Sequence, residues 1–129
     1  MMNKKLLISF AVVLCGIFSL VLLMQYNKIK QNKEQIKYLG TRVYGDEIVI
    51  ALLEYKMDNG LYPDTLKQLV PTYVQKIKSP IWGETEWDYF SEENGKDFVL
   101  LVRGSGESNQ TYSTVFGYWY NGPQPTPVD

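Results

Sequence analysis

Leu6–Met24, with the sequence LLISFAVVLCGIFSLVLLM, is an apolar segment of about 19 residues that contains no charged side chain. An α-helix of this length, with a rise of about 1.5 Å per residue, is roughly 28 Å long, close to the ~30 Å hydrocarbon core of a bilayer. About 13 of its residues are Leu, Ile, Val or Phe, and each favours insertion by roughly 0.3–0.6 kcal/mol. The sequence therefore predicts a single-pass transmembrane anchor, which with its short N-terminal tail occupies residues 1–26.

Two alternatives to an anchor are a cleavable signal peptide and the core helix of a soluble protein. A signal peptide has a shorter apolar region, about 7–15 residues, followed by small residues at the cleavage site. Here the apolar run is longer, and Gln25-Tyr26-Asn27 follows it. A helix that is apolar all round would also be hard to cover with the rest of a 129-residue chain. We therefore expect the anchor to be retained.

Charge is distributed unevenly along the chain. Before Thr41 nearly every charged residue is basic, whereas from Val43 onward there are roughly 13 acidic and roughly 6 basic residues, a net charge of about −7. An acidic domain repels phosphate, so the sequence indicates no nucleic-acid partner. Histidine is absent and Cys15 is the only cysteine, so no disulfide, cofactor or metal site is predicted and an enzyme is not expected.

Small residues recur along one side of the predicted anchor. Ala11, Cys15 and Ser19 are spaced four residues apart, and small side chains let helices approach closely in lipid. They form a candidate helix-packing face, although chance also produces such a spacing.

No signal stops the helix between the anchor and residue 58. Proline is absent there, and Tyr44, Ile48, Ala51 and Tyr55 recur at helical spacing. Asp58-Asn59-Gly60 then reads as a helix end, with Gly60 free to adopt the left-handed cap conformation. The sequence predicts one helix from about residue 5 to residue 58, half in the membrane and half packed in a domain at 27–120.

Strands are predicted after this helix. Asp64 is expected to cap a short helix that runs through Val70. Strands at 87–91 and 97–103 flank an Asn-Gly pair, which is a strong hairpin signal, and 111–120 is expected to form a third strand. The predicted fold is therefore α+β, a long N-terminal helix packed on a three-stranded antiparallel sheet. Residues 121–129, with three prolines, are expected to form a flexible tail.

The last predicted strand is rich in aromatic residues. Two interpretations remain open: these side chains pack against the long helix, or they form a surface for a protein or glycan partner. The candidate surface consists of Tyr112, Phe116, Tyr118, Trp119 and Tyr120.

Residues Ala51–Pro63, ALLEYKMDNGLYP, resemble the end of the long helix in type IV pilin-like proteins. They are most similar to the major, G-type pseudopilin of type II secretion systems. The likeness continues through Pro80-Ile81-Trp82-Gly83 and the hairpin at 87–103, and so covers about residues 48–104, roughly half of the chain.

The resemblance implies a non-enzymatic structural or assembly component of a bacterial secretion or pilus-related system. Its partners would be the lipid bilayer and other pilin-like subunits or secretion components. The resemblance also implies an N-terminus in the cytoplasm and a domain outside the cytoplasmic membrane. Counting charges alone would favour the opposite orientation, because more bases follow the apolar run than precede it. We predict the orientation that the resemblance implies, with the N-terminus in the cytoplasm.

The chain departs from the family pattern at two places. Family precursors resemble one another at a leader ending in Gly or Ala, followed by Phe and an early Glu, whereas here no acidic residue precedes Glu34. We therefore expect the N-terminus to be retained. The family's calcium loop is rich in Asp, whereas this chain has Ser105, Glu107 and Asn109, and no calcium site is expected. The alternative function is a stand-alone envelope protein that binds a protein or glycan.

Overall fold

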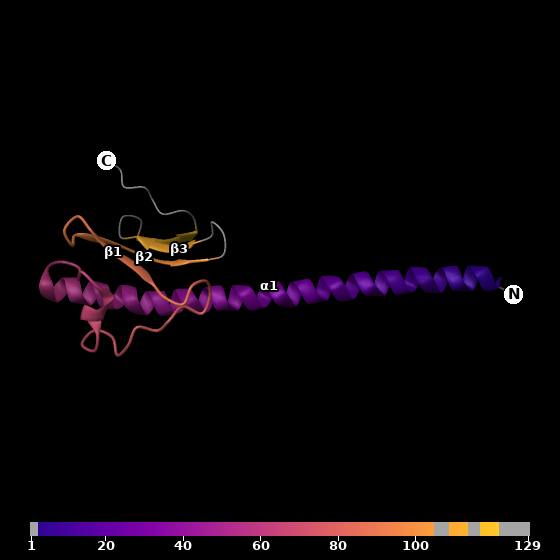
Figure 1. Ribbon diagram of the computed structural model, residues 1–129, viewed down its shortest axis with the longest axis horizontal. Helices are drawn as coiled ribbons and strands as arrows, with labels where there is room; N and C mark the ends of the chain where they lie inside the picture. The colour runs from indigo at the N-terminus through magenta and orange to yellow at the C-terminus, as the bar shows by residue number, and fades with distance from the viewer. Residues whose placement is uncertain (1–2, 105–108, 114–116, 122–129) are drawn as a thin grey trace. The chain divides into compact units, whose positions relative to one another are not determined.

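The computed structural model describes residues 3–104, 109–113 and 117–121. One long helix, one 3₁₀ helix and a four-stranded antiparallel sheet of order β1-β2-β3-β4 make up these residues (Figure 1). The predicted α+β class is confirmed, and the predicted number of strands is wrong. In chain order the elements are α1 (Lys4–Asn59), η1 (Leu66–Leu69), β1 (Asp88–Glu92), β2 (Asp97–Arg103), β3 (Asn109–Ser113) and β4 (Tyr118–Asn121).

The chain divides into two compact units, Met1–Ile36 and Lys37–Asp129, which we call the N-terminal and C-terminal units. The described residues of the N-terminal unit are exposed, and nearly all of them belong to α1. Among the described residues, α1 is the one helix long and apolar enough to cross a membrane, by its length and composition. The expected tail at 121–129 lies outside the described residues, apart from Asn121 at the end of β4.

Helix α1 ends where the sequence predicts. Gly60 has a φ of +84°, and its N–H donates to the carbonyl oxygen of Lys56 over 2.7 Å. Asn59 Nδ2 donates to the carbonyl oxygen of Tyr55 at 2.9 Å. These bonds satisfy two carbonyl groups that the end of a helix would otherwise leave without partners.

A four-residue 3₁₀ helix, η1, replaces the expected short helix from Asp64 through Val70. Its N-cap is Thr65 rather than Asp64. Thr65 has an extended backbone, and its N–H donates to Oε1 of Gln68 at 3.1 Å. The capping pair is thus Thr65 with Gln68, three residues later, which is the spacing of a capping box.

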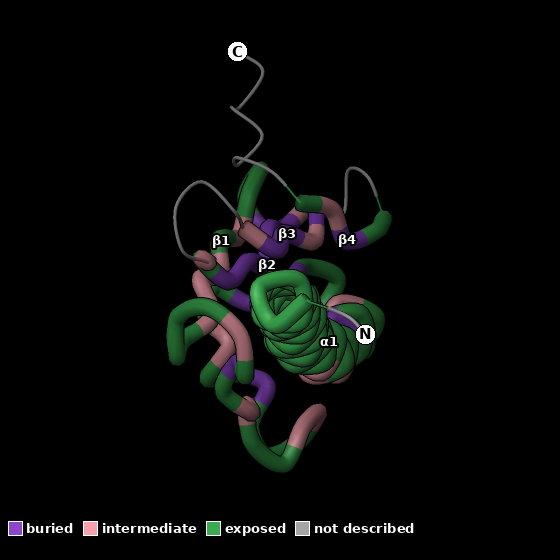
Figure 2. The backbone as a smooth tube through the Cα atoms, turned by 90° about the vertical axis from the view of Figure 1, so that its right-hand side faces the viewer, coloured by how far each residue is buried: buried purple, intermediate pink, exposed green. Residues whose placement is uncertain are grey.

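Strand β2 is the centre of the C-terminal unit. Its residues 98–102 are all buried, because β1 and β3 flank it on both sides. The sheet lies on one side of α1 (Figure 2). Phe98 and Leu100 pack in one core cluster with residues of α1 and with residues that follow it. The buried members of this cluster are Ile48, Val49, Ala51, Leu52, Tyr62, Leu69, Phe98, Leu100 and Trp119.

The expected third strand, 111–120, is two strands. β3 and β4 pair with each other antiparallel, with Tyr112 opposite Trp119. Gly117 has a φ of +68°, and its N–H donates to the carbonyl oxygen of Ser113 at 2.8 Å. Only glycine adopts this left-handed conformation without cost, so Gly117 permits a reversal within a segment that its alternation predicts to be continuous. The hairpin of β1 and β2, in contrast, lies within one residue of its predicted bounds.

Three successive turns of α1 hold the rest of the C-terminal unit. Tyr38 provides a carbonyl oxygen that accepts from Gln110 Nε2 at 3.1 Å. Thr41 is fully buried, and its hydroxyl oxygen accepts from the N–H groups of Ile81 at 2.9 Å and Trp82 at 2.8 Å. Gly45 is buried, and a Cβ atom there would lie 2.3 Å from Cζ2 of Trp119. The sheet and the connection before β1 are therefore attached to one face of α1.

Replacing Thr41 with Val should lower the stability of the C-terminal unit. The variant leaves two backbone N–H groups without their acceptor, and each such group costs about 1–3 kcal/mol, so we expect a loss of roughly 2–4 kcal/mol. Urea unfolding of the full-length protein in detergent, followed by tryptophan fluorescence, measures the change. Thr72→Val, at an exposed position, is the control and should change stability by less than about 0.5 kcal/mol. Equal midpoints for the two variants would contradict the assignment.

Replacing Gly45 with Ala should also destabilise the protein, against the usual trend. In a helix interior this substitution normally stabilises by about 1 kcal/mol, but here the new methyl group meets the indole of Trp119, and overpacking costs roughly 1–3 kcal/mol. Gly40→Ala is the matched control, because its Cβ atom would meet only the flexible end of Ile81 at 3.0 Å. We expect the melting temperature to fall clearly further for Gly45→Ala; a rise would show that the contact with Trp119 is not tight.

Candidate functional site

The predicted aromatic surface is divided between the two faces of the sheet. Trp119 is 9% exposed and, with the half-buried Tyr112, belongs to the face that packs on α1. The ring centroids of these two residues are 5.5 Å apart, and Tyr112 stacks on Phe98 at 5.7 Å. Phe116 lies outside the described residues. Tyr112 and Trp119 therefore lie where the first interpretation, packing against the long helix, places them.

Tyr118 and Tyr120 lie on the other face, because side chains alternate along a strand. Tyr118 is 58% exposed, and its ring centroid is 6.5 Å from that of Tyr120. Burial raises the pKa of the Tyr120 hydroxyl, while a hydrogen bond with Thr111 acts in the opposite direction. Of the described residues of the predicted partner surface, Tyr118 is the most exposed and the one that a ligand could reach most directly.

The strand register shows what surrounds these tyrosines. We use the term outer face for the two rows of residues that lie across the four strands on the side away from α1. The two ends of the first row, Phe90 and Tyr118, are exposed. The rows are Phe90, Val99, Ser113 and Tyr118, and Asp88, Leu101, Thr111 and Tyr120. Three aromatic side chains and Asp88 thus border a centre of buried residues, and the exposed rings of Phe90 and Tyr118 are the parts of this face that a partner could contact.

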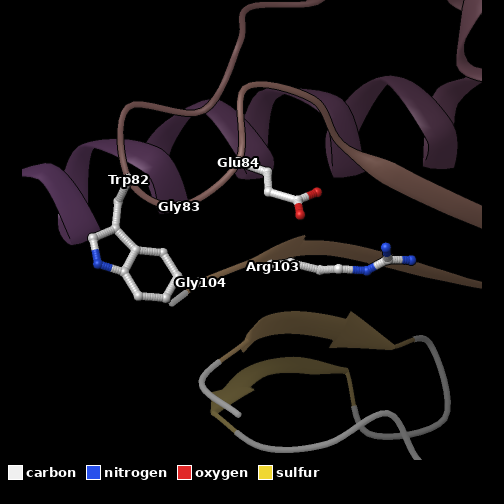
Figure 3. Close-up of a pocket in the computed structure, with 5 residues that line it drawn as sticks. All are labelled: Trp82, Gly83, Glu84, Arg103 and Gly104. Carbon is white, nitrogen blue, oxygen red and sulfur yellow. The ribbon is translucent and has the colours of Figure 1, made fainter. Parts of the chain in front are cut away.

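A pocket of about 380 Å³ lies between the connection before β1 and the end of β2. Trp82, Glu84 and Arg103 line it, together with Gly83 and Gly104. Figure 3 shows that the Trp82 ring lies on one side of the two glycines and that the Glu84 and Arg103 side chains extend to the other. The backbone N–H of Glu84 donates to the carbonyl oxygen of Arg103 at 2.8 Å, which joins the two segments that line the pocket. Apart from the Trp82-Gly83 turn, no sequence pattern indicates this pocket.

Arg103, which lines the pocket, also forms an ion pair outside it. Arg103 Nε lies 3.0 Å from Asp88 Oδ2 across the β1–β2 ladder, and both side chains are partly exposed. Such a pair contributes little to stability because water screens it, but it directs the guanidinium along the sheet. Among residues 3–104, 109–113 and 117–121, no three His, Cys, Asp or Glu side chains gather to hold a metal ion. Of the residues weighed for calcium, Ser105 and Glu107 lie outside the described residues and Asn109 begins β3.

The predicted helix-packing residues lie in the N-terminal unit. Ala11, Cys15 and Ser19 are all exposed on α1. The Ser19 hydroxyl donates to the carbonyl oxygen of Cys15 at 2.9 Å, so its hydrogen bond is made within the helix and does not require a second helix. Any packing at this face would rest on the small size of the side chains.

Exposed apolar side chains of α1 form a further surface, which the sequence analysis does not predict. Several large apolar side chains of α1 within the C-terminal unit are exposed by 42–85%. We call this set the α1 stripe, and it consists of Leu39, Val43, Ile50, Leu53 and Met57. Its signal is present in the sequence, because the residues recur at intervals of three, four or seven. The same helix also carries a second apolar face at Tyr44, Ile48, Ala51 and Tyr55, and only that one was recognised.

Known proteins give no further guide to these surfaces. Comparison of the chain with protein-family models, with characterised proteins and with solved structures finds no match. The function is therefore inferred from the anchor helix, the outer face and the α1 stripe of this chain.

Proposed function

We propose that the chain is a membrane-anchored, non-enzymatic structural or assembly subunit, similar to the pseudopilins of bacterial type II secretion and type IV pilus-related systems. The observation that carries the proposal is the composition of α1. This single helix, Lys4–Asn59, contains a segment apolar enough to cross a membrane and also contributes Ile48, Ala51 and Leu52 to the core of the C-terminal unit. A subunit built in this way acts through helix and domain contacts.

The segment that resembles the pseudopilins joins the helix to the sheet. Tyr62 is buried and its N–H donates to the carbonyl oxygen of Gly95, at the tip of the β1–β2 hairpin, at 2.8 Å. Pro63 provides a carbonyl oxygen that accepts from the Tyr89 hydroxyl at 2.7 Å, and burial raises the pKa of that hydroxyl. The Asp58–Pro63 segment thus has a structural role that would be needed in any protein of this layout.

In this proposal the anchor lies in the bacterial cytoplasmic membrane. The N-terminus is cytoplasmic and the C-terminal unit is outside. The partners are the lipid bilayer and other pilin-like subunits or secretion components. The basic residues after the apolar run, among them Lys28, Lys30 and Lys33, would then lie near anionic lipid headgroups.

A second candidate function is a stand-alone envelope protein that binds a protein or glycan. The outer face favours it, because Phe90 and Tyr118 are exposed by 42% and 58% at the two ends of one row. The absence of an acidic residue before Glu34 also favours it, since the family's assembly uses an early Glu.

The anchor can be tested by fractionation. Full-length protein should pellet with membranes and resist extraction with alkaline carbonate, because Leu6–Met24 is long enough to span the bilayer. Leu14→Arg should weaken insertion by roughly 3 kcal/mol. Gln25→Arg, which adds the same charge at the end of the apolar run, is the control and should remain in the membrane. Recovery of the unaltered protein in the soluble fraction would contradict the anchor.

The assembly role can be tested by crosslinking through the native thiol. In native membranes, a bismaleimide should join Cys15 of one chain to a second chain, or to a partner thiol. Ala11→Leu and Ser19→Leu should abolish the product without affecting insertion, because bulky side chains prevent close helix contact in lipid. Val13→Leu, a bulkier side chain on the opposite side of the helix, is the control. The role fails if the protein stays monomeric and secretion is unchanged when the chain is deleted; the second candidate would then hold.

A further inference from the structure

The α1 stripe lies opposite the face of α1 that packs on the sheet. At 100° per residue, Leu39, Val43 and Ile50 project from the side of the helix opposite to the buried Thr41 and Ile48. The exposed side of a surface helix normally carries polar residues. Here it carries apolar side chains that are 57% exposed at Val43 and Ile50 and 85% exposed at Met57. A contiguous apolar stripe of this kind marks an interaction surface.

The spacing of the stripe is that of a two-helix seam. Val43, Ile50 and Met57 are seven residues apart, and Leu39 and Leu53 occupy the intervening positions with Asp46 between them. This is a heptad pattern, with the first set at a positions and the second at d. β-Branched residues at a with Leu at d favour two parallel strands. The occupant that fits this stripe is therefore a second α-helix of the same kind.

Charges at the edges of the stripe select the orientation. Arg42 precedes an a residue by one position, whereas Glu47 and Glu54 each follow one by four positions. Lys56 also precedes an a residue, but its Nζ donates to the carbonyl oxygen of Lys96 at 2.8 Å, so Arg42 forms the basic edge. In a parallel pair the basic edge of one helix meets the acidic edge of the other, and Arg42 faces Glu47 of the second copy. In an antiparallel pair acid meets acid and base meets base. Glu47 already accepts from Lys78 at 2.6 Å, but a carboxylate accepts several hydrogen bonds.

We propose that the α1 stripe packs in parallel against the α1 stripe of a second copy of this chain. The heptad pattern fits a helical partner, and the complementary edges at Arg42 and Glu47 fit an identical partner related by a two-fold axis. The inference rests on the proposed function for one premise, that both copies are anchored side by side in one membrane, which also excludes the antiparallel arrangement. It goes beyond the proposed function by assigning a contact surface in the C-terminal unit.

Asp46 limits how tightly the seam closes. It occupies a d position between Leu39 and Leu53, and its Oδ1 accepts from the indole N–H of Trp119 at 2.6 Å. The carboxylate is thus held by the sheet, and the seam has no apolar side chain at this d position. The apolar contact is therefore interrupted between Leu39 and Leu53, and Ile50, Leu53 and Met57 form its longest uninterrupted part.

Single cysteines in the full-length chain test the seam. In a Cys15→Ser background, Ile50→Cys and Met57→Cys should each form a disulfide-linked homodimer in oxidised native membranes, because equivalent a positions face each other in a parallel pair. Ile81→Cys is the matched control: Ile81 is 47% exposed and apolar but lies outside α1, and it should remain monomeric.

A charge variant tests the edges. In the Met57→Cys background, Arg42→Glu should lower the fraction of disulfide-linked dimer severalfold. Arg42→Lys, which keeps the charge, should retain most of it. Lys76→Glu makes the same change of charge at an exposed position outside α1 and should have no effect. If Arg42→Glu leaves the fraction unchanged, the pairing of opposite edges is wrong and the inference fails.

Three other results would overturn the inference. These are trapping of Ile50→Cys only to a protein of different mass, equal trapping of Ile81→Cys, and preferential trapping between Leu39→Cys and Met57→Cys copies, which indicates antiparallel helices. Crosslinking at Cys15, without any at Ile50→Cys or Met57→Cys, would contradict the seam and leave the assembly role intact. Trapping at both stripe positions, with secretion unchanged on deletion, would retain the seam and remove the assembly role.

Discussion

The contact between Gly45 of α1 and the indole of Trp119 is the constraint on which the C-terminal unit depends. A Cβ atom at residue 45 would lie 2.3 Å from the ring, so the indole lies directly against the helix backbone. The neighbouring Asp46 fixes the ring by accepting from its N–H, and the ring in turn supports Tyr112 and, beyond it, Phe98. Glycine costs a helix about 1 kcal/mol relative to alanine, and packing of a large aromatic side chain offsets that cost.

The same contact explains why one side of α1 is left without a partner inside the molecule. The sheet lies close to Gly45, and the connection before β1 is tied to Thr41, so the inner side of α1 is covered along its length together with the apolar Ile48 and Leu52. The large apolar residues Val43, Ile50 and Met57 lie on the other side, where they are more than half exposed. A helix that only had to cover a sheet would carry polar residues there.

Local signals in the sequence were sufficient for much of this fold, and non-local ones were not. The end of α1 and the β1–β2 hairpin follow from Gly60 and from the Asn-Gly pair, because each is decided by backbone conformation within a few residues. The third strand failed because alternation of aromatic residues continues through Gly117, and alternation carries no information about a reversal of the chain. That reversal also decides the faces, because it places Tyr112 opposite Trp119 and on the other side of the sheet from Tyr118 and Tyr120. The candidate surface could therefore not be placed correctly, since facing depends on register across two strands. The α1 stripe was missed for a related reason, because a helix with two apolar faces does not reveal which of them the sheet covers.

Two copies held in one membrane need little affinity between their soluble parts. Once two anchors are in contact, the seam becomes a second contact within the same complex, and such a contact forms at a high effective concentration, so a seam interrupted by Asp46 still forms. The tether also restricts the pair to the parallel orientation, and this is the orientation in which Arg42 faces the acidic edge of the other helix. Asp46 links the seam to the sheet, because the carboxylate that lies between Leu39 and Leu53 is the one that holds Trp119 on β4. The position of β4, and with it the exposed Tyr118, is thereby connected to the seam through one side chain. In this arrangement a single residue, placed next to the glycine that admits the indole, connects the core, the outer face and the contact between copies.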